Sequence, residues 1–209
     1  MNLPNKIPIF PLSNFIIFPK TSVPLNIFEP RYIQMIDDVM KGEKIIGMVQ
    51  PKKKNSDIPT LYDIGCAGKI SNFEKTEDGR YLIIIIGISR FKIEKEIITK
   101  KKYREFNINF NKYSNDLIEE RKSINFSDIE LIFKNFKNLF DKMGYIINWK
   151  ELEKESLEKT INGLSMAAPF SSEEKQILLE TTNIIERKKK LEEILNTYVL
   201  DDFSNTTIQ

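Results

Sequence analysis

Histidine is absent from the 209 residues, and cysteine occurs once, as Cys66. Catalytic triads, histidine-based zinc hydrolysis and imidazole proton relays are therefore excluded. A single cysteine also excludes an intramolecular disulfide, a paired redox centre and a cysteine-based zinc site. Because Cys66 lies in an apolar segment with no histidine to activate it, we expect a buried, inert thiol rather than a nucleophile. The sequence predicts neither a metal site nor a cofactor.

The other candidates for nucleophile or acid are weak. Ser165 lies in a segment that resembles a nucleophile elbow, but the second glycine is missing and the surrounding residues predict a helix. Carboxylates occur in adjacent pairs at 37–38, 119–120 and 201–202. Side chains of adjacent residues point apart, so we interpret these pairs as solvated charges. Because the sequence also has no GxxxxGK phosphate loop, it predicts no catalysis.

Basic residues offer a different kind of site. Lysine triplets at 52–54, 100–102 and 188–190 are the best argument for nucleic acid. The formal net charge is only +2, from 32 basic and 30 acidic side chains, and aromatic residues are not interleaved with the lysines. Solvated lysines are therefore the favoured interpretation. Arg80 and Arg90 carry planar, multidentate groups, and we expect them to bridge carbonyls or acids inside a barrel.

Turn-forming residues divide the chain into two halves. Eight of nine prolines lie between Pro4 and Pro59, and six of eight glycines lie between Gly42 and Gly87. This distribution predicts strands in the first half and helices in the second, with the boundary near residues 114–123. We assign residues 1–115 to a β-rich subdomain, 116–200 to a helical bundle and 201–209 to a frayed tail.

The first half contains short β-prone runs between turn residues. Asp78-Gly79 predicts a tight hairpin, and Gly87 indicates a bulge in the longest strand. Pro30 at a first helical position predicts one helix over residues 30–42, packed on the sheet. The runs expected to form strands are residues 7–12, 15–18, 23–27, 44–50, 61–70, 80–94 and 106–110.

Capping signals mark the helices of the second half. Ser127 with Glu130, Ser171 with Glu174 and Asn183 with Glu186 each predict a helix start. Gly144 and Pro169 predict helix ends, and a further helix is expected between about residue 149 and Pro169. Four helices would then form a small bundle.

No segment has the pattern of a membrane span. The longest uninterrupted apolar stretch is residues 82–88, whereas a span needs about 20 apolar residues. The N-terminus also lacks the charged-then-apolar plan of a secretory signal. We therefore expect a cytoplasmic protein with no membrane association.

Several ordered segments resemble the N-terminal substrate-binding domain of Lon proteases. The first are Ile7-Pro8-Ile9-Phe10-Pro11-Leu12, Phe18-Pro19, Pro24-Leu25 and Ile27-Phe28-Glu29-Pro30-Arg31-Tyr32. The later ones are Gly47-Met48-Val49, Asp63-Ile64-Gly65-Cys66, Asp78-Gly79-Arg80-Tyr81, Gly87-Ile88-Ser89-Arg90-Phe91, Glu174-Lys175-Gln176 and Leu178-Leu179-Glu180. The resemblance implies an α+β fold, with a β-rich PUA-like pseudo-barrel followed by a C-terminal helical bundle. In the family an ATPase and a Ser-Lys peptidase module follow, and the resemblance implies a free-standing, non-catalytic relative.

The resemblance also implies a function. It points to a protein-binding module that holds exposed apolar segments of unfolded or client proteins, or to an adaptor for a separate ATP-dependent protease. The alternative is an RNA-binding PUA-like module that uses the lysine triplets. The cluster from Glu29 to Tyr32 could form a binding site, but we favour the interpretation that it starts a helix and holds that helix on the sheet. We interpret the family-motif residues as structural: Pro11, Glu29, Arg31, Tyr32, Gly65, Gly79, Arg80, Gly87 and Arg90.

A candidate docking segment for a client is Phe15, Ile16, Ile17 and Phe18. In a strand, alternate side chains point to opposite faces, so two of the four would point away from the core. The alternative is that the segment is sandwiched between the sheet and the helices, because monomers rarely leave contiguous apolar patches exposed.

Overall fold

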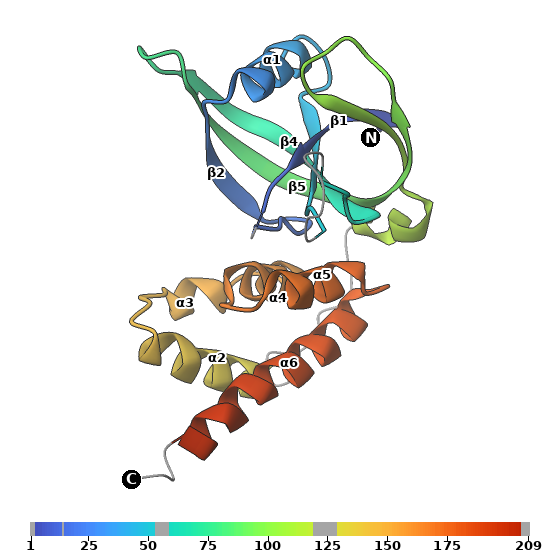
Figure 1. Ribbon diagram of the computed structural model, residues 1–209. Helices are drawn as coiled ribbons and strands as arrows, with labels where there is room; N and C mark the ends of the chain where they lie inside the picture. Colours follow the sequence, from blue (N-terminus) through green and yellow to red (C-terminus); the bar gives the residue numbers. More distant parts are fainter. Residues whose placement is uncertain (1–2, 14, 53–58, 119–128, 206–209) are drawn as a thin grey trace.

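A closed sheet forms the first half of the chain, and helices form the second (Figure 1). The computed structural model describes residues 3–13, 15–52, 59–118 and 129–205, the last six by their backbone alone. Strands and helices thus follow the order that the proline and glycine distribution predicts. The α+β prediction is confirmed.

Five of the six strands close into a ring. The strand order is β2-β5-β4-β3-β1-β6, and β6 also pairs with β5. β1 and β3 are parallel, whereas the other pairs are antiparallel. β2 pairs with β5 at the free end of the sheet. The strands are β1 (Lys6–Pro11), β2 (Ser22–Ile27), β3 (Ile45–Val49), β4 (Ile64–Lys75), β5 (Tyr81–Ile97) and β6 (Arg104–Asn109).

Apolar side chains pack against both faces of the sheet. One cluster includes Phe91 of β5 and residues from β1, β3, β4 and β6. A second and larger cluster joins the other side of the sheet to helix α1 and to the helical half. A continuous core therefore links the two halves of the chain.

The hairpin predicted before β5 and the bulge predicted within it are both confirmed. Gly79 has φ +82°, and the amide of Thr76 donates to the carbonyl of Arg80 across the hairpin at 2.9 Å. Beside Gly87 the pairing of β4 with β5 shifts by one residue, which is the expected bulge.

Residues 15–18 do not form the predicted strand. Residues 18–21 instead form a turn that lies against Gly87 of β5. The Lys20 amide donates to the Gly87 carbonyl at 2.8 Å, and the Gly87 amide donates to the Thr21 carbonyl at 2.9 Å. A Cβ atom on Gly87 would lie 2.1 Å from the Phe18 carbonyl oxygen. Only glycine allows the turn to approach β5 this closely.

Helix α1 (Pro30–Val39) begins where predicted but ends before residue 42. Tyr32, Met35 and Ile36 form its buried face. Asp37 accepts a hydrogen bond from Tyr81 at 2.6 Å, and Asp38 accepts one from Tyr103 at 2.8 Å. Asp37 is exposed and Asp38 is half-buried, so the carboxylates stay in contact with solvent as expected, and because neighbouring helical residues point in different directions each also meets a different tyrosine.

Most predicted helix starts are confirmed. Ser171 and Glu174 form both hydrogen bonds of a capping box, and Asn183 Oδ1 accepts from the amide of Glu186 at 2.9 Å. The start predicted at Ser127 lies outside the described residues. The elements are the 3-10 helix η1 (Asn111–Leu117), then α2 (Glu130–Lys142), α3 (Trp149–Leu152), α4 (Leu157–Ala167), α5 (Ser172–Glu180) and α6 (Ile184–Asn205).

Two boundaries in this half differ from the prediction. The helix expected from residue 149 to Pro169 is divided into α3 and α4, because Ser156 caps a new helix by accepting from the Lys159 amide at 3.3 Å. Helix α6 continues to Asn205, beyond residue 200, where the helical bundle was predicted to end. Elongating an existing helix adds a hydrogen bond for each residue fixed, so a helix can extend beyond its last buried residue. None of the helices in the described ranges is long and apolar enough to span a membrane.

Candidate functional site

Arg90 joins the two halves of the molecule. Its side chain is 2% exposed, and it binds the Asp116 carboxylate through Nε at 2.8 Å and Nη2 at 2.6 Å. Nη1 donates to the carbonyls of Leu179, at 3.0 Å, and Thr181. The expected bridging of acids and carbonyls is confirmed, but its location inside a barrel was wrong. Consecutive strand residues point to opposite faces, and it is the neighbouring Phe91 that belongs to the core cluster of the closed sheet.

Other side chains at this junction bind backbone groups across it. Gln176 donates to the Ile64 carbonyl at 3.1 Å, and Asn162 donates to the Pro19 carbonyl at 2.8 Å. Backbone carbonyls buried between the halves thus obtain donors from the helices. Hydrogen bonds therefore join the two halves in addition to the apolar core between them.

Arg80 has a different environment from the one expected. It is exposed at the hairpin and pairs with Asp78 at 2.6 Å. The hydrogen bond from Arg80 holds the pKa of Asp78 below its ordinary value. Because the hairpin ends in solvent, Arg80 meets no buried carbonyl or acid of the barrel, and that prediction was wrong.

Four family-motif residues come together at a groove. Pro11, Glu29, Arg31 and Tyr32 border a volume of about 360 Å³ between the end of β1, β2 and the start of α1. Tyr32 is buried beneath it, and burial raises the pKa of its hydroxyl. Arg31 lies 4.6 Å above the Tyr32 ring and binds Glu29 at 2.8 Å. The cluster therefore has a structural part, Tyr32, and a solvent-facing charged part.

Phe28 adds an aromatic side chain to this groove. Its side chain is 64% exposed although it directly precedes the cap of α1. The groove thus combines an exposed aromatic ring with a charged pair, which suits contact with a partner that has both apolar and polar groups.

A second solvent-facing feature lies on β5. Leu82, Ile84 and Ile86, which we call the outer β5 row, are between 37% and 43% exposed. Between them, Ile83 and Ile85 point to the core. Covered strands are apolar on both faces, whereas a strand with one solvated face normally alternates with polar residues. The outer β5 row is therefore an apolar sheet face open to solvent.

The sequence contained the signal for this row. The apolar run 82–88 predicts a strand and excludes a membrane span. In an antiparallel sheet, an unbroken apolar run also predicts apolar side chains on the face that is normally solvated. That consequence was missed.

The docking segment proposed at residues 15–18 is part of the core. Ile16, Ile17 and Phe18 are buried, and Phe15 is half-buried. The Arg187 guanidinium of α6 lies 5.3 Å from the centre of the Phe18 ring. The segment offers no apolar row to a client, so the sandwiched alternative describes it and the docking hypothesis was wrong.

The remaining candidates have structural surroundings. Cys66 is buried in β4, and burial raises the pKa of its thiol. Ser165 is buried in α4 and donates to the Ile161 carbonyl at 2.7 Å. A Cβ atom on Gly65 would lie 2.9 Å from the Phe91 ring, so the core packing leaves no room for a side chain at this position. These residues belong to the core.

The combination of a closed mixed sheet and a helical half is a fold that is seen in solved structures. The Lon N-terminal domain protein from Xanthomonas campestris has a TM-score of 0.63 and 17% identity, and the match covers 91% of this chain and 97% of that one. The N-terminal domain of the Mycobacterium avium complex Lon protease has a TM-score of 0.64 and 14% identity, with 91% and 98% covered. At these identities the likeness shows the fold.

The sequence itself shows the family. The chain belongs to the family of the ATP-dependent protease La (LON) substrate-binding domain, which matches residues 6–197. It is 29% identical to the Lon protease of Desulfosudis oleivorans over 205 residues, which are 93% of this chain and 24% of that protein. It is also 29% identical to the Lon protease of Flavobacterium johnsoniae, covering 88% of this chain and 23% of that protein. The chain thus spans about a quarter of the length of these relatives.

Proposed function

We propose that this chain recognises other proteins by their exposed apolar segments, which it holds on the outer β5 row. In this role it selects substrates for an ATP-dependent protease, as part of the protease or as an adaptor, and catalyses no reaction itself. The family description supports substrate binding. The exposed row of Leu82, Ile84 and Ile86 is the observation that supports apolar recognition.

The expected affinity follows from the area available. Complete burial of an apolar side chain of this size contributes about 1.5–3 kcal/mol, and these three are already more than half covered. After the cost of ordering a flexible client, two or three such anchors give binding of about micromolar strength. Weak binding of this kind suits a domain that must release each client.

The groove at α1 extends the same surface. Asn26 of β2 pairs with Leu82 in the sheet and also borders the groove that contains Phe28. A client segment that crosses β2 would therefore contact both the outer β5 row and Phe28. Arg31 and Glu29 at the far side offer charged partners to polar residues of the client.

Replacing Ile84 with aspartate tests this proposal. We expect Ile84→Asp to raise the Kd for a permanently unfolded, fluorescently labelled casein at least about tenfold, because a charge on the row must be desolvated when the client binds. Its melting temperature should change little, since the side chain already faces solvent. Fluorescence anisotropy and thermal unfolding measure the two quantities.

Ile98→Asp is the matched control, because Ile98 is fully exposed and lies just beyond the end of β5. It should bind casein like the unchanged chain. Casein binding to the unchanged chain should also persist when salt rises from about 50 to about 200 mM, which sharply weakens phosphate-driven binding. Equal casein affinity for the unchanged chain and Ile84→Asp would contradict the proposal.

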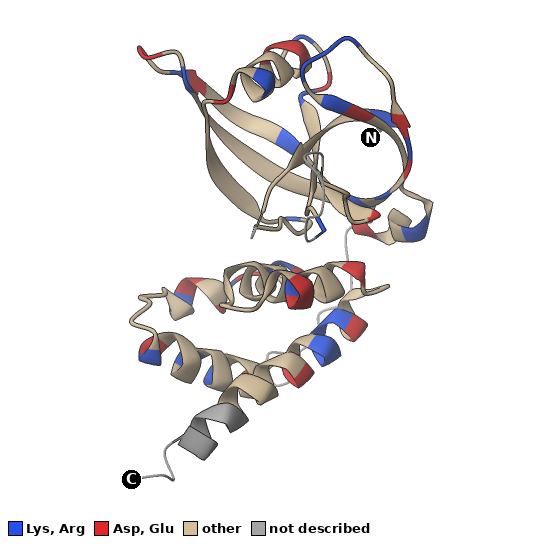
Figure 2. Ribbon diagram, in the orientation of Figure 1, with Lys and Arg blue, Asp and Glu red and all other residues tan. Residues whose placement is uncertain are grey.

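The lysine triplets give less support to RNA binding. Lys101 pairs with Glu105 at 2.8 Å, and Lys188 pairs with Glu192 at 3.4 Å. Residues 53–58 lie outside the described ranges. Figure 2 shows that acidic residues alternate with basic ones along the ribbon of α6. Paired lysines of this kind attract phosphate less than an uninterrupted basic face.

A further inference from the structure

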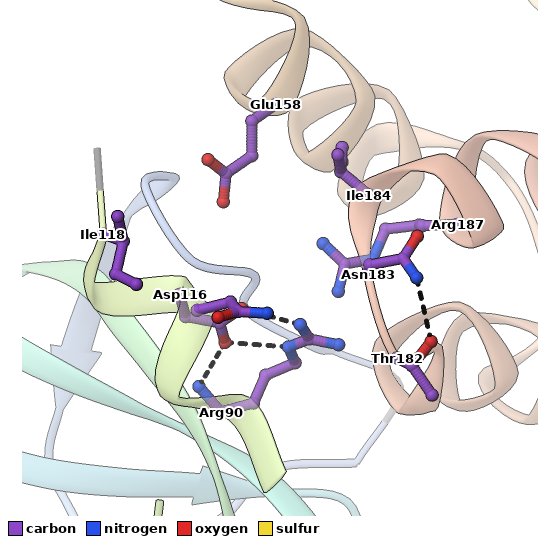
Figure 3. A pocket seen from close by; sticks show the side chains of 9 residues that line it. Arg90, Asp116, Ile118, Glu158, Thr182, Asn183, Ile184 and Arg187 are labelled. Carbon is purple, nitrogen blue, oxygen red and sulfur yellow. Dashed lines mark hydrogen bonds and ion pairs between the residues drawn. The ribbon is translucent and has the colours of Figure 1, made fainter. Parts of the chain in front are cut away.

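A cavity of about 200 Å³ that is bordered by four charged side chains lies between the two halves of the chain (Figure 3). Arg90 and Asp116 border it from the β-rich half, and Glu158 and Arg187 border it from the helical half. All four side chains are buried. The cavity thus gathers two buried cations and two buried anions, and the pairing among them decides what it can bind.

Arg187 is the incompletely partnered member. Its side chain is 1% exposed, Nε donates to the Leu178 carbonyl at 3.0 Å, and Nη1 donates to Asn162. Nη2 is buried and has no hydrogen-bond partner among the described residues. A buried charged donor without an acceptor is costly, so this nitrogen would gain from an acceptor that enters the cavity.

The other charged side chains pair with one another and leave the positive charge of Arg187 without a carboxylate partner in the part of the chain that the structure describes. Asp116 is held by two hydrogen bonds from the Arg90 guanidinium, and Glu158 is paired with Lys20. Each carboxylate therefore has its own cation, and one positive charge remains at Arg187. Burial, and secondly the charge of Arg90, lower the pKa of Arg187 to about 9. Both effects disfavour the charged form of the guanidinium, so a nearby anion would stabilise it.

The shape and the local dipole agree with this charge. A cavity of about 150 Å³ holds a molecule as large as benzene, so this one has room for a small oxyanion. Thr182, Asn183 and Ile184 also border it, at the positive end of the 22-residue helix α6. Glu158 opposes an anion, but its pairing with Lys20 offsets that repulsion.

We propose that this cavity binds a small oxyanion, a carboxylate or inorganic phosphate, which accepts a hydrogen bond from Nη2 of Arg187. Because its walls come from both halves, the bound anion stabilises their present arrangement. This site is separate from the outer β5 row and goes beyond client recognition.

Thermal unfolding of the full chain in sodium acetate, sodium phosphate or sodium chloride at equal ionic strength tests the proposal. We expect acetate or phosphate to raise the melting temperature in a saturable way that chloride does not reproduce, and the more effective salt identifies the oxyanion. Arg187→Met should weaken that response at least about tenfold in Kd, because it removes a charged hydrogen bond. Arg104→Met, which removes an arginine outside the cavity lining, should keep it.

A second variant keeps the proposal testable if Arg187→Met does not fold. Glu158→Gln removes the opposing carboxylate charge, so it should bind the same oxyanion more tightly than the unchanged chain. Equal responses of the unchanged chain to all three salts would overturn the proposal. An undiminished oxyanion response in folded Arg187→Met, or weaker binding by Glu158→Gln, would also overturn it.

Discussion

Replacing Arg90 with methionine is expected to lower the free energy of unfolding by about 3–5 kcal/mol, the usual cost of removing one partner from a buried ion pair. The variant leaves Asp116 buried without its cation and leaves the carbonyls of Leu179 and Thr181 without a donor. Methionine retains much of the side-chain volume, so the effect reports lost polar contacts rather than a large cavity. Urea denaturation of the full chain measures it.

Arg104 supplies the matched control for this prediction. It binds Glu96 through Nε and Nη2 at 2.7 and 2.6 Å, with the same two-pronged geometry, but the pair is partly exposed. Arg104→Met should therefore cost only about 1 kcal/mol or less. A double variant that combines Arg90→Met with Asp116→Leu should recover part of the loss, because no buried charge is left unpaired. Similar small losses for Arg90→Met and Arg104→Met would show that Arg90 does not hold the two halves together.

Substitution of Gly87 by alanine is expected to have the second-largest effect, a loss of about 3 kcal/mol in the free energy of unfolding. The new Cβ atom would lie 2.1 Å from the Phe18 carbonyl oxygen, which is backbone and cannot rotate away. The turn at residues 18–21 would have to leave β5, and with it the hydrogen bonds of Lys20 and Thr21 to Gly87. Chemical denaturation again gives the measurement.

For Gly163 we expect that the same substitution by alanine raises the free energy of unfolding. It lies within α4, and a Cβ atom there meets nothing within 4 Å. Gly163→Ala should raise the free energy of unfolding by about 0.5–1 kcal/mol, since alanine favours a helix over glycine by this amount. If Gly87→Ala proved as stable as the unchanged chain, the close contact at Phe18 would be wrong.

Local rules account for the parts of the fold that the sequence predicted. The Asp78-Gly79 hairpin and the capping box of Ser171 with Glu174 are fixed by residues within a few positions of one another. Six of the seven predicted strand runs appear for the same reason, since alternation and turn residues act along a short stretch. The family resemblance added the expected order of these elements.

Contacts between distant residues could not be predicted in this way. The partners of Arg90 are 26 residues away at Asp116 and 89 residues away at Leu179, and no local pattern connects them. Residues 15–18 have a strand-like composition, but the position of Gly87 decides that they turn and enter the core. Residue types indicate which side chains tend to be buried, whereas the element that covers them, or leaves Ile84 and Phe28 exposed, depends on the tertiary arrangement.

Methyl NMR of the isoleucine-labelled chain, titrated with unlabelled, permanently unfolded casein, tests the proposed client surface most directly. The chain has exposed isoleucines both on the outer β5 row, at Ile84 and Ile86, and away from it, at Ile98 and Ile146. We expect the methyl signals of Ile84 and Ile86 to shift or broaden as casein is added, while those of Ile98 and Ile146 stay unchanged. Unchanged signals at Ile84 and Ile86 under conditions in which casein is bound would contradict the assignment of client recognition to this face of the sheet.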